Sequence, residues 1–422
     1  VGSSVTYNND ADPPNITITP TNALSKNTVY AISYPSGAFT QSGAGGSSVG
    51  IAYTFDSVDI NNQIWLIGSN SKGQLGQNSD GDSRSSPVQM GGKSNWKYVA
   101  KSGMGRRFYH AINTDGELWG WGYNRDDEIL GLGPSYGSIG AVSSPVQIPG
   151  TTWDNVWSSN YVASANKTDG TLWVWGDNWQ GTLGMNQAEP AGYNSPVQLT
   201  SATNWTDIGA RGKVNAQVNT DGELYIWGYN DQGGLGQNNQ TNYSSPVQVP
   251  GTTWANLSVV QQIIGAVKTN GTLWMWGQNQ RGVLGQNQNP GTCAAYSSPV
   301  QIPGTTWSTD KNKLSVGRAI KTDGTLWTWG NGDYGALGQN STASVSSPVQ
   351  VPGTTWASVS QVSDGMYTVA TKTDGTAWSW GYNDLGALGQ NNRTQYSSPV
   401  QIPGTSWSKG GGRYDGIWLM TS

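Results

Sequence analysis

The strongest constraint on this chain is an internal repeat with a period of about 52 residues. The tetrapeptide Ser-Pro-Val-Gln opens seven segments, which start at Ser86, Ser144, Ser195, Ser245, Ser298, Ser347 and Ser398. A Gly-x-Leu-Gly turn recurs at the same spacing between Gly73 and Gly386, and Glu128 replaces its first glycine in one copy. Repetition of this kind indicates one fold built from similar units, although 422 residues would otherwise suggest several domains.

Each repeat is expected to form short antiparallel strands. Asp169-Gly170 is typical of a hairpin turn with positive φ angles, and it precedes Leu-Trp-Val-Trp. That strand is apolar at nearly every position, which indicates burial on both faces. The proline of Ser-Pro-Val-Gln suits an edge strand, because it has no N–H for the ladder.

These units predict an all-β protein, a seven-bladed β-propeller. The last unit stops at residues 416–420, before its Asp-Gly turn, and the first strand, residues 63–68, has no preceding Ser-Pro-Val-Gln segment. The two partial units complement each other. We therefore expect one blade to be shared between the chain ends, which closes the ring.

The strand Leu-Trp-x-Trp-Gly followed by Gly-x-Leu-Gly-Gln resembles the regulator of chromosome condensation repeat family, over residues 51–422. The resemblance implies a seven-bladed propeller. Eukaryotic members commonly carry a histidine before the Thr-x-x-Gly turn, and here only His110 takes that place. The regular, simplified repeat therefore suggests a bacterial or phage-like member. The Gly-Trp-Arg-His-Thr motif of the family's plant ultraviolet photoreceptor is absent from the sequence.

Two domains are expected: residues 1–50, an N-terminal arm and strand segment, and residues 51–422, the propeller. Residues 1–28 are polar and contain Pro13-Pro14, which favours an extended arm or linker. Strand candidates follow at 28–34 and 47–55. This segment either completes the shared blade or attaches the propeller to a larger assembly.

Catalysis and metal binding find little support in the sequence. We expect no catalytic residues, no metal site, no cofactor and no enzymatic activity, because no nucleophile elbow, phosphate-binding loop or zinc-ligand spacing is present. The single His110 and the single Cys293 lack partners in sequence, and the cluster Asp126-Asp127-Glu128 is expected to be a solvated loop.

Composition excludes other partners. The net charge is −4 without basic runs, which argues against nucleic acid, and no apolar stretch approaches the roughly 18–20 residues that span a bilayer. Of the 22 tryptophans, 19 fall at repeated positions and are interpreted as structural wedges between blades. Trp179 is the one expected in an exposed loop.

Binding remains, and propellers bind through loops gathered at the ends of the ring. The segments after each Trp-Gly are rich in aromatic and amide side chains, which suit sugars and proteins alike. The predicted binding residues are Tyr123, Asn124, Asn178, Trp179, Tyr229, Asn230, Gln280, Arg281, Asp333, Tyr334, Tyr382 and Asn383. The alternative is that several of them, the asparagines above all, only satisfy their own turns.

The leading hypothesis is a non-catalytic extracellular or virion-surface protein, such as a phage fibre or adhesion appendage, that binds a protein or a cell-surface glycan. With only 11% charged residues, such binding is expected to depend little on salt. One alternative is a secreted enzyme inhibitor, because the resemblance includes a bacterial β-lactamase inhibitor. A second is an exchange factor for a small GTPase, like the family's founding member.

Overall fold

The computed structural model describes residues 62–91, 95–102, 107–124, 129–136, 139–159, 161–187, 192–211, 213–288, 294–362, 365–404, 406–413 and 416–421, and the backbone of four strands before residue 57. The chain divides into two compact units, Val1–Ile60 and Asn61–Ser422. The propeller unit thus begins at Asn61, beyond the boundary expected after residue 50.

The first unit contains two antiparallel strand pairs. They are β1 (Ser3–Asn8) with β2 (Asn15–Pro20), and β3 (Val29–Ser33) with β4 (Ala52–Asp56). The strands expected at 28–34 and 47–55 are present in β3 and β4. Within residues 1–28, expected to form an extended arm or linker, lie the paired strands β1 and β2.

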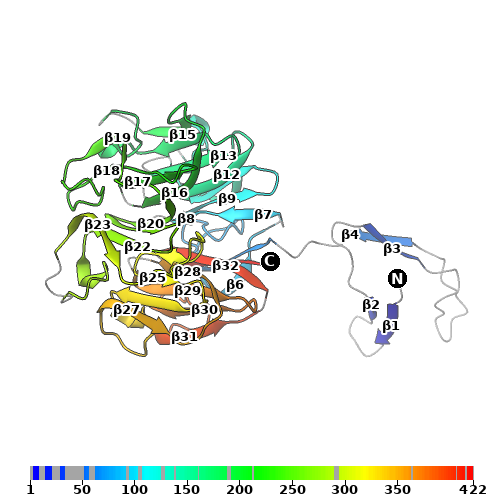
Figure 1. Ribbon diagram of the computed structural model, residues 1–422. Helices are drawn as coiled ribbons and strands as arrows, with labels where there is room; N and C mark the ends of the chain where they lie inside the picture. Colours follow the sequence, from blue (N-terminus) through cyan, green and yellow to red (C-terminus); the bar gives the residue numbers. More distant parts are fainter. Residues whose placement is uncertain are drawn as a thin grey trace, which may run out of the picture. The chain divides into compact units, whose positions relative to one another are not determined.

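The second unit is a ring of seven four-stranded antiparallel sheets, which confirms the all-β seven-bladed propeller (Figure 1). From the central axis outward, blade 1 consists of β32 (Trp407–Arg413), β33 (Gly416–Thr421), β5 (Ile64–Gly68) and β6 (Arg84–Gln89). Blade 2 consists of β7 (Trp96–Val99), β9 (Phe108–Asn113), β10 (Leu118–Tyr123) and β11 (Ala141–Ile148). Blade 3 consists of β12 (Trp153–Ser158), β13 (Val162–Lys167), β14 (Leu172–Gly176) and β15 (Tyr193–Gln198), with β8 (Lys101–Ser102) added beside β12.

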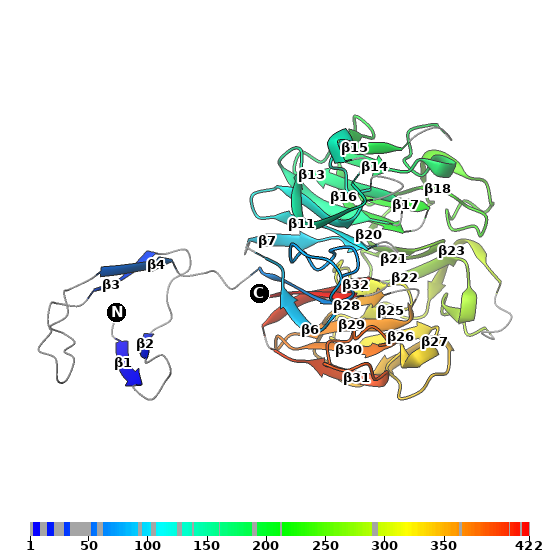
Figure 2. The same cartoon turned by 180° about the vertical axis from the view of Figure 1, so that it is seen from behind.

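The remaining blades follow in chain order, as the colours of Figure 2 show from behind. Blade 4 consists of β16 (Trp205–Arg211), β17 (Val214–Asn219), β18 (Leu224–Gly228) and β19 (Tyr243–Gln248), and blade 5 of β20 (Trp254–Val260), β21 (Ile263–Lys268), β22 (Leu273–Gly277) and β23 (Tyr296–Ile302). Blade 6 consists of β24 (Leu314–Ser315), β25 (Arg318–Ile320), β26 (Leu326–Gly330) and β27 (Val345–Val351), and blade 7 of β28 (Trp356–Val362), β29 (Tyr367–Lys372), β30 (Ala377–Gly381) and β31 (Tyr396–Ile402). Short 3-10 turns are η1 (Pro134–Tyr136), η2 (Trp179–Gly181), η3 (Gln280–Gly282) and η4 (Asp333–Gly335).

Ring closure occurs in blade 1, as expected from the two partial repeats. The C-terminal strand β33 pairs antiparallel with β5, Gly416 opposite Gly68 and Met420 opposite Ile64. The outer strand β6 then pairs with β5. Strands from Ile64 onward therefore complete the shared blade, which corrects the alternative that residues 1–50 complete it.

Buried tryptophans join each blade to the one before it. The second tryptophan of the third strand is fully buried in six blades, and its Nε1–H donates to a carbonyl in the preceding blade's Gly-x-Leu-Gly turn at 2.7–3.1 Å. Blade 1 has Ile67 at this position. The tryptophans that open the inner strands of six blades are also buried, and so is Trp307, which precedes the short inner strand of blade 6. At both positions the interpretation as structural wedges is confirmed.

The first tryptophan of the third strand differs from that interpretation. Its side chain is half-buried wherever it occurs, at Trp65, Trp119, Trp173, Trp274, Trp327 and Trp378. Period-2 alternation turns it toward the opposite side of the sheet from its buried neighbours. These residues present part of an indole ring to solvent.

Blade 6 departs from the repeat near the axis. Its inner strand β24 has only two residues, and the preceding loop reaches other blades. Lys311 Nζ donates to Asn155 Oδ1 of blade 3 at 3.0 Å, the carbonyl oxygen of Asp310 accepts from Asn256 Nδ2 of blade 5 at 2.8 Å, and the carbonyl oxygen of Asn312 accepts from Val359 N of blade 7 at 2.9 Å. The loop therefore ties three other blades together on the inner side of the ring.

Candidate binding surface

The segments predicted to bind a partner all leave the ring at one end. Antiparallel pairing alternates strand direction within each blade, so the chain leaves every third strand toward the same end of the propeller. We call this end the turn face. The Asp-Gly turns lie at the opposite end, the hairpin face.

Three of these segments form the turns η2, η3 and η4. The central residue of each has a left-handed backbone: φ is 59° at Gln180, 56° at Arg281 and 59° at Tyr334. This conformation costs roughly 1–2 kcal/mol for a residue other than glycine. The following glycine is required by packing, since a Cβ at Gly335 would lie 2.4 Å from Ser397 Cα of the next blade. The turn thereby holds the side chain of Tyr334 at the surface, where it is 39% exposed.

The asparagines among the predicted residues lie beneath the surface. Asn124, Asn178, Asn230 and Asn383 are all buried, and in each the Oδ1 accepts the N–H of the leucine in the Gly-x-Leu-Gly turn, at 2.8–3.3 Å. Their Nδ2 groups donate to backbone carbonyls further along the turn. The expectation of exposed amides at these four positions is corrected, because the turn itself uses both ends of the side chain.

The aromatic residues do meet at the surface, in pairs drawn from adjacent blades. Trp179 is 37% exposed, and its ring centroid lies 5.5 Å from that of Tyr229. Tyr334 and Tyr382 meet edge-to-face at 4.9 Å. In each pair one ring is exposed and the other, Tyr229 or Tyr382, is half-buried beneath it, so the pair offers a rigid apolar contact area at low entropic cost.

A lysine that the sequence did not single out completes the first pair. Lys213 Nζ lies 3.2 Å from the ring centroid of Trp179 and 5.5 Å from that of Tyr229. Burial lowers the pKa of Lys213, while Asp177 and Asp231 oppose that shift. The hydrogen bond that the Tyr229 hydroxyl donates to Asp231 is the main cause of a raised pKa at Tyr229, and burial is the second cause. Lys213 precedes β17, some 34 residues after Trp179, so proximity in sequence gives no sign of this contact.

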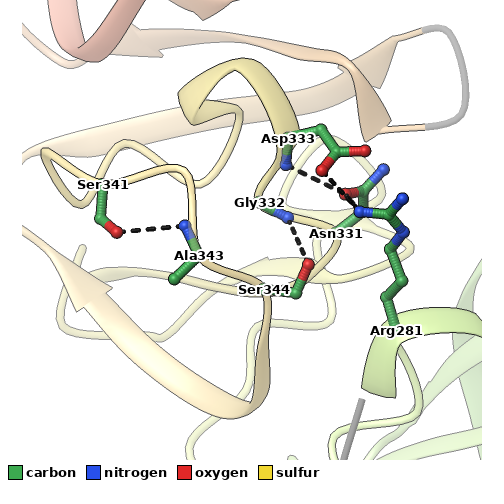
Figure 3. A network of polar contacts seen from close by, with 7 residues as sticks. All are labelled: Arg281, Asn331, Gly332, Asp333, Ser341, Ala343 and Ser344. Carbon is green, nitrogen blue, oxygen red and sulfur yellow. Dashed lines mark hydrogen bonds and ion pairs between the residues drawn. The ribbon is translucent and has the colours of Figure 1, made fainter. Parts of the chain in front are cut away.

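Charged residues link blades 5 and 6 across the same face (Figure 3). Arg281 Nη1 lies 2.5 Å from Asp333 Oδ1 and donates to Asn331 Oδ1 at 3.2 Å. The N–H of Asp333 also donates to Asn331 Oδ1, at 3.0 Å. Figure 3 shows Ser344 accepting the N–H of Gly332 on the other side of this loop. The pair is half-exposed, so it orients the two side chains more than it stabilises the fold.

The remaining predicted residues flank these groups. Gln280 is exposed, and with Arg281 it lines a cavity of about 240 Å³ between blades 5 and 6, whose walls include Val260 and Ile263. Tyr123 is half-buried, with Lys72 Nζ 6.0 Å from its ring centroid. The structure thus gathers Trp179, Tyr229, Gln280, Arg281, Asp333, Tyr334 and Tyr382 on one face; we call these seven residues the turn-face surface.

His110 is the other candidate residue that the structure describes. His110 is buried between blades, with Nδ1 2.7 Å from Ser158 Oγ and Nε2 3.2 Å from the carbonyl oxygen of Leu130. Cys293 and the cluster Asp126-Asp127-Glu128 lie outside the described residues. Among the residues described, no group of three or more His, Cys, Asp or Glu could hold a metal ion. Nor does this part of the chain contain a helix long and apolar enough to cross a bilayer.

Comparison with known proteins supports the repeat. Residues 221–265, 270–310, 323–370 and 374–409 match the regulator of chromosome condensation (RCC1) repeat. The ultraviolet-B receptor UVR8 of Arabidopsis thaliana is 26% identical over 335 residues, which are 78% of this chain and 63% of the receptor. The E3 ubiquitin-protein ligase HERC2 of Homo sapiens is 27% identical over 354 residues, 82% of this chain and 6% of the ligase. The chain therefore spans less than two thirds of either relative.

Solved structures share the fold at low sequence identity. Human WBSCR16 has a TM-score of 0.73 at 17% identity, covering 86% of this chain and 100% of that one. Yeast RCC1 (Prp20), solved bound to Kap60, has a TM-score of 0.71 at 17% identity, covering 86% and 89%. These likenesses confirm the seven-bladed propeller. The relatives named here are plant, human and yeast proteins, so a bacterial or phage-like origin stays a prediction.

Proposed function

We propose that this propeller with RCC1 repeats is a non-catalytic binding protein that holds a protein partner on its turn-face surface. The observation that carries the proposal is the meeting of aromatic side chains from adjacent blades: exposed Trp179 packs on half-buried Tyr229, and exposed Tyr334 packs on half-buried Tyr382. Each pair is fixed by turns whose geometry the next blade enforces. A surface preorganised in this way loses little entropy when it binds.

The composition of the surface favours a protein over a small ligand. Tyrosine, tryptophan and arginine dominate the energetics of protein interfaces, and all three occur in the turn-face surface. The neighbouring cavity of about 240 Å³ is large enough for one inserted side chain but small for a whole ligand. An interface of standard size would cover the turns of several blades at once.

Relatives of the same fold support this proposal by analogy. Yeast RCC1 was solved in complex with Kap60, and Prp20p has been described with its binding properties to Gsp1p and histones. At 17–18% identity these partners belong to those proteins. What supports the proposal is that the architecture serves protein binding elsewhere.

The setting is a further part of the proposal. We infer an extracellular or virion-surface location, with a glycan as the alternative ligand, from the regular repeat and the low content of charged residues. Mass spectrometry of secreted and particle fractions tests the location. Inhibition of a β-lactamase by the purified chain would favour the secreted inhibitor, and accelerated nucleotide release from a small GTPase would favour the exchange factor.

The binding test compares matched surface variants. Trp179→Ala and Tyr334→Ala remove exposed rings from the turn face, and Val349→Ala removes an equally exposed apolar side chain (38%) from the outer strand β27. Proteins captured from host extract by each immobilised chain are quantified by mass spectrometry. The captured amount of a partner held by the turn face should fall at least tenfold with Trp179→Ala and Tyr334→Ala and stay unchanged with Val349→Ala. Equal retention by all three variants would refute the assignment.

A further inference from the structure

A second cavity lies between blades 5 and 6, and its lining shares no residue with the turn-face surface. Its volume is about 360 Å³, within the range of small-ligand sites. Pro303 and Pro348 line it from the outer edges of the two blades, and Lys321 and Trp327 line it from either side of the Asp-Gly turn of blade 6. We call this cavity the 5/6 groove.

An aromatic ring and an ammonium group form one wall of the groove. Lys321 Nζ lies 4.3 Å from the ring centroid of Trp327 and 5.0 Å from that of Trp307. Trp307 is buried and meets Trp327 edge-to-face, which fixes both rings. Trp327 is half-buried, so part of its ring faces the groove and solvent. Trp327, expected from its place in the repeat to act only as a wedge between blades, therefore also presents an accessible aromatic surface.

Neutral polar groups form the rest of the lining. Asn287 Oδ1 accepts from Ser347 Oγ at 3.1 Å, and Gln286 Nε2 donates to the carbonyls of Leu284 and Gln301, both at 3.2 Å. These bonds hold the amide and hydroxyl side chains in fixed positions at the rim. The lining thus combines a fixed aromatic face, apolar proline rings, two amides, a hydroxyl and one ammonium group, and it contains no carboxylate.

The same set of residue types recurs at two neighbouring blade interfaces. Between blades 4 and 5 it comprises Gln237, Asn238, Pro250, Lys268, Trp274 and Pro299, and between blades 6 and 7 it comprises Gln339, Asn340, Pro352, Lys372, Trp378 and Pro399. The geometry of the lysine recurs with it: Lys268 Nζ lies 4.8 Å from the centroid of Trp274, and Lys372 Nζ lies 4.4 Å from that of Trp378. Three consecutive interfaces therefore carry the same set of residue types and the same lysine–tryptophan contact.

Other interfaces lack part of the set and serve as internal controls. Between blades 3 and 4, Asn219 stands where the lysine would be, Tyr225 replaces the tryptophan and Leu199 replaces the first proline. In blade 1, Thr421 stands at the lysine position beside Trp65. The fold therefore accommodates other residues at the lysine position.

We propose that the 5/6 groove and its two equivalents each bind one neutral pyranose unit of a saccharide. The C–H groups on one face of a sugar ring carry partial positive charge and pack against the part of the Trp327 indole that lines the groove beside Lys321. Hydroxyl groups find donors at Lys321 Nζ and amide partners at the rim. A set of equivalent sites in series also suits a ligand that is itself a repeating polymer, because occupancy of one site raises the effective concentration at the next.

The test is a titration of the intact chain with neutral oligosaccharides. Maltohexaose, cellohexaose and chitohexaose are the probes, with an oligogalacturonate as the acidic comparison, and binding is followed by calorimetry and by saturation-transfer NMR. The corresponding disaccharide of the responding series is expected to bind with a stoichiometry near three. Failure of every neutral probe at millimolar concentration would overturn the proposal, as would selective, salt-suppressed binding of the galacturonate.

Variants that introduce the threonine of blade 1 at the lysine position assign the sites. Lys321→Thr is expected to lower the stoichiometry by one, and the combination of Lys268→Thr, Lys321→Thr and Lys372→Thr to weaken binding at least tenfold. The single variants keep the test informative if the triple variant fails to fold. Trp179→Ala, which affects the turn face alone, should leave saccharide binding unchanged, and the lysine variants should leave capture of a protein partner unchanged. Saccharide binding that survives the triple variant, or that is lost with Trp179→Ala, would overturn the assignment.

Discussion

The tryptophan that joins each blade to the preceding one permits a quantitative test of the ring's cohesion. Trp227 and Trp276 are both fully buried, and each donates Nε1–H to a turn carbonyl of the blade before it. The two carbonyls differ. Thr182 O accepts from Trp227 at 3.1 Å and also from Asn215 Nδ2 at 2.6 Å, whereas Gly234 O accepts from Trp276 at 2.9 Å.

Phenylalanine at either position replaces the indole with a smaller phenyl group and removes the Nε1–H donor. The smaller side chain lowers the free energy of unfolding by about 1–2 kcal/mol, less than the 3–5 kcal/mol typical of complete truncation to alanine. Loss of the hydrogen bond adds about 1 kcal/mol at both positions, and a buried carbonyl left without a partner adds about 1–3 kcal/mol more. Because Asn215 keeps Thr182 O bonded, Trp227→Phe is expected to destabilise by about 2–3 kcal/mol and Trp276→Phe by about 3–6 kcal/mol.

Urea unfolding measures the difference, with tryptophan fluorescence and circular dichroism required to give coincident transitions before free energies are compared. A second pair provides replication. Ala336 O, the acceptor for Trp380, also accepts from Thr368 Oγ1 at 2.9 Å, whereas Val283 O accepts from Trp329 at 2.7 Å. Trp380→Phe should therefore be milder than Trp329→Phe. Equal destabilisation within both pairs would refute the argument that sharing of the acceptor sets the cost.

Two further predictions concern the hairpin face and the turn glycines. Hydrogen bonds from the threonine two residues on lower the pKa of Asp169, Asp323 and Asp374, so their contribution to stability is complete above the ordinary aspartate pKa of 3.8 and is lost as the pH falls through the lowered native value. In blade 5, Asn270 stands at the aspartate position and its Oδ1 accepts the same two hydrogen bonds from Thr272. Changing Asp169, Asp323 and Asp374 together to asparagine should therefore keep the fold and reduce the loss of stability at acid pH. An unchanged loss of stability at acid pH would contradict this reasoning. Gly335→Ala should destabilise by several kcal/mol more than Gly81→Ala, because both have positive φ but only the Cβ at Gly335 meets backbone of the next blade, at 2.4 Å, whereas a Cβ at Gly81 meets nothing within 4 Å; equal midpoints of thermal unfolding would contradict it.

The blades and their closure were predictable because the repeat encodes local features of strong physical meaning. The Asp-Gly turns, the strands that are apolar on both faces and the two partial repeats at the chain ends specify which strands pair, without knowledge of contacts between blades. The position of Trp179 at the surface was predictable for the same reason, since it breaks the repeat inside a loop.

Side-chain direction within the turns was not predictable from composition. Asn230 and Tyr334 lie two positions apart in equivalent turns, yet Asn230 is buried and its Oδ1 accepts the N–H of Leu235, whereas Tyr334 is exposed. Asn230 is held inside by its hydrogen bonds to the turn backbone, whereas the left-handed backbone at Tyr334 directs that side chain outward. Contacts such as that of Arg281 with Asp333, 52 residues apart, exist only once the blades are placed side by side.

Closure of the ring in blade 1 also decides how the propeller can be embedded in a longer polypeptide. The N–H of Asn62 donates to Thr421 O at 3.2 Å, so the chain enters and leaves the ring at the same point. A domain whose first and last residues are neighbours can be inserted into a surface loop of a host protein without separating the two ends of that loop. For the same reason its ends can be joined and new ones opened at an exposed Asp-Gly turn, which would make the propeller a suitable cassette for circular permutation.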